Sequence, residues 1–87
     1  MSTSPAYADS PLSSARHCFA VTPSDSAALE RRTKGLYVGV TGDVVLRASQ
    51  SAADVTFRNV PAGMILDVQA SHVRATGTTA SAIVALA

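Results

Sequence analysis

Short runs in which apolar and polar residues alternate, separated by turn-forming residues, most constrain the fold of this 87-residue chain. Alternation with a period of two is typical of a β-strand that buries one face. Runs of this kind cover residues 17–21, 35–40, 44–48, 55–60, 64–75 and 82–87. Strands at such short spacing predict an all-β fold, a small antiparallel β-sandwich or barrel, and the length allows one domain.

The alternation also assigns side chains to faces. In the second run it places Tyr37 on the face opposite to Leu36 and Val38. In the fourth run it places Phe57 and Val60 on opposite faces. Because successive side chains of a strand point to opposite sides of the sheet, one set in each run is expected in the core.

Two short stretches predict tight turns. Gly42 and Asp43 form a favourable two-residue hairpin loop, which would pair the strands on either side of it. Residues 60–63, Val-Pro-Ala-Gly, predict a four-residue turn, because proline presets the second position and glycine suits the fourth.

The last part of the chain is apolar and carries no charge after Arg74. Residues 64–75 predict one long strand, with a bulge or bend near His72 and Val73, where the alternation shifts. An exposed apolar strand is an aggregation hazard, so residues 82–87 need a partner. We expect them to pair with residues 64–75 as a hairpin and to find further partner surface on other copies or other proteins.

The segment 22–32 carries signals of a helix start. Thr22 suits the cap position, Pro23 suits the first helical position, and Asp25 completes the spacing of a capping box. The run is short before Gly35, so we expect either a helix of at most two turns or an extended loop.

Residues 1–14 are rich in serine, contain proline and show no periodicity. This composition predicts a flexible N-terminal arm ahead of a single β-domain at 15–87. The arm is either a disordered terminus or a segment that orders against a partner, with Tyr7 and Leu12 as its anchors.

The small size limits the core, because a domain of this length is marginal on its own. Cys18 is the only cysteine, which excludes an internal disulfide, and no Cys/His cluster has zinc spacing. No metal or cofactor is therefore expected. Oligomerisation is the remaining common route to stability.

The net charge of +1 argues against nucleic-acid binding, which needs a basic face. No signal peptide and no membrane span is recognisable, so we expect a protein that is made in the cytoplasm and does not leave it by secretion. The densest charge is the basic run Arg31, Arg32 and Lys34. It predicts a solvated loop or, alternatively, a contact to an acidic protein surface or an anionic polysaccharide.

The polar residues form no pattern that predicts catalysis. Cys18 and His72 allow a nucleophile–base pair on composition alone, but Cys18 lies in an apolar strand, where a free cysteine is expected to be a small buried hydrophobe. His17 points to the opposite face, and His72 is expected to be solvated or hydrogen-bonded. Asp43 and Asp54 fall at turns, where aspartate bonds the local backbone. No catalytic or phosphate-binding motif is present, and we expect no enzyme.

Several stretches together resemble a known family. These are "FAVTPSDSA" (19–27), "TKGLYVGVTGDV" (33–44), "VTFRNVPAGMIL" (55–66) and "ATGTT" (75–79). In this order they resemble the head spike base protein of phage-like gene transfer agents, and similar short proteins occur among prophage structural genes. The resemblance covers roughly residues 16–87.

The resemblance implies a structural protein of a virus-like particle, assembled in the cytoplasm and released by lysis. Such a base sits on the capsid protein at fivefold vertices as a pentamer and carries a fibre that attaches the particle to polysaccharide on a recipient cell. Under this reading we expect Tyr37, Phe57, Val84 and Leu86 to be shared between the core and the subunit interface. The family offers no catalytic residue and no cofactor.

Two other classes of function remain as alternatives. One is a small carbohydrate-binding or tail-fibre β-module, since sheet faces with Ser, Thr, Gln and Asn can bind sugar. The other is a small enzyme that uses Cys18, His17 and His72. A sugar ligand, or an activity lost on replacing these three residues, would favour the respective alternative.

Overall fold

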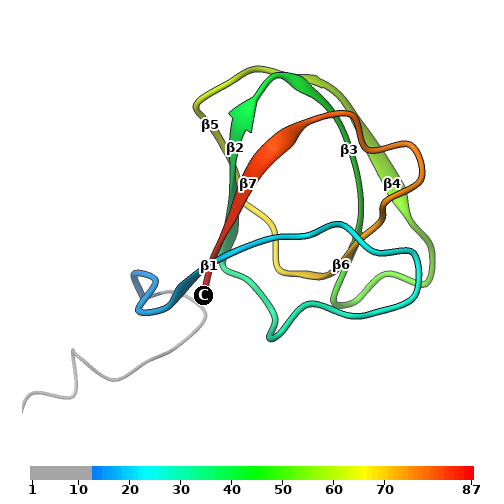
Figure 1. Cartoon of the computed structure of the whole chain (residues 1–87). Helices are drawn as coiled ribbons and strands as arrows, with labels where there is room; N and C mark the ends of the chain where they lie inside the picture. Colours follow the sequence, from blue (N-terminus) through cyan, green and yellow to red (C-terminus); the bar gives the residue numbers. More distant parts are fainter. Residues whose placement is uncertain (1–12) are drawn as a thin grey trace, which may run out of the picture.

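The computed structural model describes residues 13–87, whose strands form two antiparallel sheets packed face to face (Figure 1). The four-stranded sheet has the order β1-β7-β2-β5, and the three-stranded sheet has the order β4-β3-β6. The described residues contain no helix, so the predicted all-β sandwich is confirmed. The strands are β1 (Cys18–Ala20), β2 (Gly35–Val40), β3 (Gly42–Ala48), β4 (Val55–Val60), β5 (Met64–Leu66), β6 (Ala70–Val73) and β7 (Ser81–Leu86).

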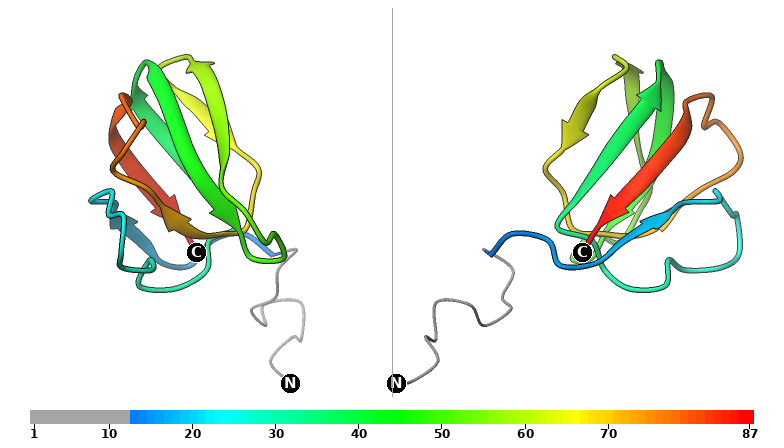
Figure 2. Two further views of the ribbon diagram at one scale, coloured as in Figure 1. Left: turned by 90° about the vertical axis from the view of Figure 1, so that its right-hand side faces the viewer. Right: turned by 60° about the vertical axis from the view of Figure 1, so that its left-hand side comes forward.

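The apolar strand β7 lies inside the four-stranded sheet, between β1 and β2 (Figures 1 and 2). Phe19 of β1 pairs with Ala85, and Tyr37 of β2 pairs with Val84. Both backbone edges of β7 are therefore satisfied within the chain, and the predicted hairpin with residues 64–75 is wrong. Ala87 and His17 exchange backbone hydrogen bonds of 2.7 and 2.9 Å, which holds the beginning and the end of the described chain side by side.

Gly42 and Asp43 are not a hairpin loop. Only Thr41 separates β2 from β3, and these two strands belong to different sheets. The chain turns a corner here, and the backbone at Ala80 crosses so closely that a Cβ on Gly42 would lie 2.4 Å from the Ala80 nitrogen. Glycine is needed at this position for a close backbone approach, which also lets the Asp43 carbonyl accept the N–H groups of Thr79 and Ala80.

The stretch predicted as one strand, 64–75, is divided between the two sheets. Its first part, β5, pairs with β2, and its second part, β6, pairs with β3. The crossing is at 67–69, and the single-strand prediction is wrong. The alternation continues through the crossing, with Val68 half-buried, so it gave no sign of the change of partner. The bulge expected near His72 is present, because Arg47 pairs with His72 and Ala48 with Ala70, which leaves Ser71 as an extra residue in β6.

A bulge in β4 corrects the predicted faces of that strand. Gly42 pairs with Val60 and Val44 pairs with Phe57, so β4 has one residue more than β3 between the pairs. Asn59 absorbs it with a φ of 53° and donates its N–H to the Asp43 carboxylate at 2.9 Å. Val60 is buried, and Phe57 packs on the same core, so these residues are not on opposite faces.

The turn predicted at 60–63 is present, one residue later than expected. The N–H of Met64 donates to the carbonyl of Pro61 at 3.2 Å. Gly63 is the third residue of this turn and has a φ of +85°, a conformation that favours glycine.

The segment 22–32 is an extended loop, which confirms the second of the two alternatives. Its backbone, with that of Thr33, covers the free edge of β6: the N–H groups of Ser24, Leu29 and Thr33 donate to the carbonyls of Val73, Ser71 and Ala70. A helix would use these N–H groups internally, so edge protection replaces helix formation here.

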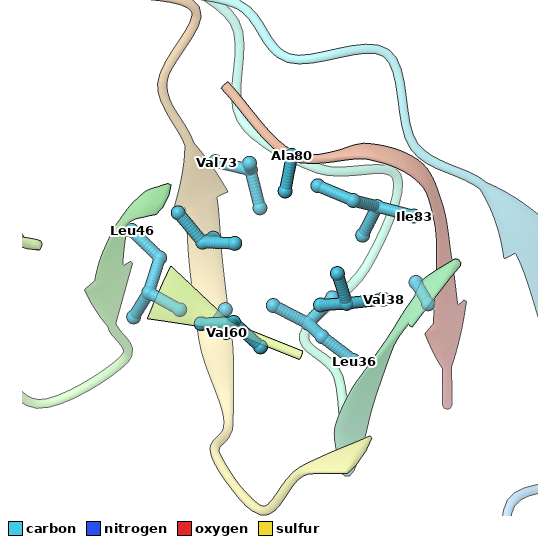
Figure 3. Packing of buried hydrophobic residues seen from close by; sticks show 10 residues of the cluster. Leu36, Val38, Leu46, Val60, Val73, Ala80 and Ile83 are labelled. Carbon is cyan, nitrogen blue, oxygen red and sulfur yellow. The ribbon is translucent and has the colours of Figure 1, made fainter. Parts of the chain in front are cut away.

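The core between the sheets consists of small and branched side chains from both layers (Figure 3). Thr33 is its buried polar residue, and it is satisfied, because its hydroxyl donates to the Val68 carbonyl at 2.9 Å and accepts the Ala70 N–H at 3.0 Å. The buried apolar residues are Leu36, Val38, Val44, Leu46, Val60, Ala70, Val73, Ala80, Ile83 and Ala85.

Candidate assembly surfaces

The outward side of the four-stranded sheet is apolar and carries no charged residue on its strands. Its central pairs place Tyr37 between Ile65 of β5 and Val84 of β7. On the far side, β1 pairs Cys18 with Leu86 and Ala20 with Val84. We define the outer sheet face as Cys18, Ala20, Tyr37, Ile65, Val84 and Leu86.

Gly35 makes this face continuous. An ideal Cβ on Gly35 would lie 3.3 Å from the Ile65 Cγ2 atom and 3.8 Å from the Leu86 Cδ1 atom. The side chains of Ile65 and Leu86 therefore close over the glycine from the two neighbouring strands. A larger residue at 35 would have to push them apart.

The size of the outer sheet face is that of an interaction site. Two strands of six residues and two of three, at about 3.3 Å per residue and spaced about 4.8 Å apart, have a footprint of about 300 Å². Tyr37 is 39% exposed and Ile65 is 54% exposed. A contiguous apolar patch of a few hundred Å² on so small a domain is typical of a surface that contacts another protein.

The four residues expected at a subunit interface do not all meet. Tyr37, Val84 and Leu86 lie together on the outer sheet face, whereas Phe57 belongs to β4 of the other sheet and packs against the core. Ile65 was missed. The alternation of the stretch that follows already placed Leu66 inside, so an outward Ile65 was readable from the sequence.

The outward side of the three-stranded sheet is polar. Arg58 and Asp43 approach to 3.7 Å, the Arg47 Nε donates to the Ser51 carbonyl at 3.0 Å, and Thr56 pairs with Val45. His72, which pairs with Arg47, is half-buried and hydrogen-bonded to the Ser71 hydroxyl at 2.8 Å, as predicted. These are the contacts of a solvated sheet face.

Cys18 is exposed, so the prediction of a buried hydrophobe is wrong. The phase of β1 explains this, because Phe19 packs against the core and its neighbour must point outward. Cys18 and His72 lie on different sheets and do not form a nucleophile–base pair. His17 instead contacts Glu30, with 2.6 Å between Nε2 and Oε2. Across residues 13–87, no group of three or more His, Cys, Asp and Glu side chains is placed to hold a metal ion.

The basic run has two roles. Arg31 and Arg32 are exposed on the loop, as expected for solvated residues. Lys34 is structural, because its ammonium donates to the Ser13 hydroxyl at 3.0 Å and to the Ser14 carbonyl at 3.1 Å. The predicted anchors Tyr7 and Leu12 lie outside the described residues.

A polar cluster ties the 22–32 loop to the strand ends; we call its members Asp25, Asp54, Arg74 and Thr76 the clasp. One Asp25 carboxylate oxygen accepts the N–H groups of Ala75 and Thr76 at 3.0 and 2.9 Å, and the other accepts the Thr76 hydroxyl at 2.6 Å. Arg74 donates to both Asp54 oxygens and to the Asp25 carbonyl. The hydrogen bond from the Thr76 hydroxyl, followed by its N–H, lowers the pKa of Asp25 below 3.8.

Helices long and apolar enough to cross a membrane are not found in the described part of the chain. The fold thus offers two surfaces of contrasting chemistry. In the described part of the chain, the hydrogen-bonded polar groups named above stabilise the fold.

Comparison with known proteins gives one informative result. No protein-family model matches the chain, and no curated protein matches it. Among solved structures, the chain is similar to a chain of the capsid of a native gene transfer agent (GTA) particle, computed with C5 symmetry. The two are 40% identical, superpose with a TM-score of 0.83, and are covered over 100% of both chains. This chain therefore belongs to the structural proteins of gene transfer agent particles.

Proposed function

We propose that the protein is the base of a head spike: a pentamer at a fivefold vertex of the particle, seated on the capsid protein and holding a fibre used for attachment to a recipient cell. The observation that carries this proposal is the full-length likeness to a chain of a GTA capsid with C5 symmetry. The role is non-enzymatic and needs binding surfaces alone. In this role the protein contacts cell-surface polysaccharide only indirectly, through the fibre.

The layout of the domain supports such a role. Ser13, Lys34 and Ala87 lie at one end of the strands, where β2 begins and β7 ends. Val40 and the Pro61–Gly63 turn lie at the other end, with the Ala62 N–H bonded to the Thr41 hydroxyl. A base needs one end for the capsid and one for the fibre. We assign the capsid to the end at which the described chain begins, because in a spike base the arm at 1–14, with Tyr7 and Leu12, would anchor in the capsid.

Exposed apolar side chains support the assignment of the opposite end to the fibre. Val40 is 49% exposed and Met64 is 43% exposed, and both lie next to the turn. They are the apolar anchors that a fibre would contact in this proposal.

The test is to delete the gene in cells that produce the particles. We expect intact, DNA-filled heads whose vertices lack spikes, seen by cryo-electron microscopy, and weaker adsorption to recipient cells. A copy tagged at the first residue should restore both, whereas a tag after Ala87 is unsuitable, since Ala87 is buried and hydrogen-bonded. Unchanged vertices, with the tagged protein located on the tail, would contradict the proposal.

A glycan array with the purified protein separates the spike base from a carbohydrate-binding module. A base is expected to retain the capsid protein and the fibre but no sugar. Specific, saturable binding of a glycan would favour the module instead.

A further inference from the structure

The chain itself covers the apolar core and the edges of β6 and β7, whereas the apolar outer sheet face is exposed. The 22–32 loop and Thr33 bond along the free edge of β6, and β1 and β2 cover both edges of β7. On the outer sheet face, Tyr37 is 39% exposed and Ile65 is 54% exposed. The occupant of this face therefore has to be another segment or another chain.

We propose that the outer sheet face is the surface that one copy of this chain packs against the next copy around the vertex, an inference that rests on the proposed function. The chemistry favours a second copy. A charged surface selects its partner through complementary potential. A face without charge cannot select a partner in this way. It suits a second copy of the chain, whose position is fixed by the symmetry of the ring. Because each copy carries the same net charge of +1, an uncharged contact also avoids bringing like charges together.

The size of the face agrees with this occupant. A footprint of about 300 Å² is a little over a third of what one partner buries in a standard protein–protein interface. In a ring each copy makes two such contacts, so the ring closes on several modest interfaces rather than one large one. A contact of this kind is heterologous: the outer sheet face meets a different surface of the next copy, because a symmetric face-to-face contact would stop at a dimer.

The first experiment identifies the occupant directly. A photo-reactive benzoyl-phenylalanine replaces Tyr37, which is likewise a phenylalanine substituted at the para position, and the particles are assembled in the producing cells and irradiated. A cross-linked product that contains two copies of this chain, identified by mass spectrometry, is the expected result. Cross-links to the capsid protein, to the fibre, or to residues 1–12 of the same chain would each overturn the inference.

The second experiment tests the energy of the contact with a matched pair of variants. Ile65→Asp places a charge on the outer sheet face, and Val55→Asp places the same charge on a β-branched residue of β4. The two positions are 54% and 53% exposed. An unpaired carboxylate in a dry contact is strongly unfavourable, so Ile65→Asp should lower the copies per particle about tenfold or more, and Val55→Asp should stay within about twofold of the wild type. Equal incorporation of both variants, or equal loss of both with circular dichroism showing folded chains, would overturn the inference.

These outcomes separate the inference from the proposed function. A chain that is found at the vertex but cross-links through Tyr37 to the capsid keeps the spike base and loses the inference. A chain that cross-links to its own copies elsewhere on the particle keeps the inference and loses the spike base.

Discussion

The outer faces of the two sheets are made from strands of the same period, yet their chemistry is opposite. On the four-stranded sheet, β2 and β7 present Tyr37, Val84 and Leu86 to the outside. On the three-stranded sheet, the outward residues include Arg47 of β3 and Arg58 of β4. Since the inward residues of both sheets are alike, the fold needs neither outward set. Under the proposed interface, the outward set decides which face meets water and which face meets a protein.

Two neighbouring residues of β2 give the most direct test of this comparison. Leu36→Ala removes a fully buried side chain, and we expect a loss of about 2–5 kcal/mol in the free energy of unfolding. Tyr37→Ala, one residue along and outward, should cost the isolated chain less than about 1 kcal/mol and yet lower its incorporation into particles. Urea unfolding and copy number per particle measure the two effects. If Tyr37→Ala destabilised the isolated chain as much as Leu36→Ala, the outer sheet face would belong to the fold.

Cys18 reports on the state of the apolar face without any substitution. In the isolated chain its thiol is exposed, so it should react with a maleimide at the rate of a free cysteine. In particles we expect the rate to fall about tenfold or more, because a packed interface excludes the reagent. The control is Cys18→Ser combined with Thr56→Cys, which moves the thiol to the polar face and should react alike in both states. Equal protection at both positions would remove the distinction between the faces.

Asp25 tests whether the covered edge depends on charge. Its folded pKa lies below the ordinary value of 3.8, chiefly because of the hydrogen bond from the Thr76 hydroxyl. Its contribution is therefore complete above pH 3.8 and is lost as the pH falls through the folded pKa. Asp25→Asn should lower the Tm at about pH 7, and its Tm should fall less than that of the wild type between about pH 5 and about pH 2. Parallel Tm curves for the two proteins would show that the clasp does not need the carboxylate.

The smallest effect is expected on the polar face. Arg58 is 76% exposed, and its approach to Asp43 is 3.7 Å. An exposed pair of this kind is screened by solvent, so Arg58→Ala should change the free energy of unfolding by less than about 0.5 kcal/mol and leave incorporation unchanged. A clear loss of incorporation would make the polar face a second contact surface and would weaken the contrast.

The bounds of several strands could be predicted from the sequence, but the pairing of the strands could not. The predicted bounds 35–40 and 55–60 are those of β2 and β4, because alternation is a property of neighbouring residues. The same alternation runs on through 67–69 while the chain passes from one sheet to the other, so it could not reveal the change of partner. The corner at Gly42 looked like a hairpin for the same reason, since its cause is the distant backbone at Ala80.

The candidate site was predicted in part for the same physical reason. Tyr37, Val84 and Leu86 are outward by strand phase, which the sequence contains, but their meeting on one face depends on β7 entering between β1 and β2. Asp25 shows that the distant partner of a polar residue also could not be predicted. It has the spacing of a helix-capping residue, and it does accept backbone N–H groups, but those of Ala75 and Thr76, which no local pattern identifies.

The arrangement of β2 and β7 has a mechanical consequence. Their pairs run from Gly35 with Leu86 at one end of the domain to Val40 with Ser81 at the other. Inter-strand hydrogen bonds lie perpendicular to the strands. A pull on the fibre along the line between the two ends, as in the proposed spike, would load these bonds in shear and all together rather than one after another. In the proposed spike, a load on the attached particle would then act on a sheet oriented to resist being drawn apart.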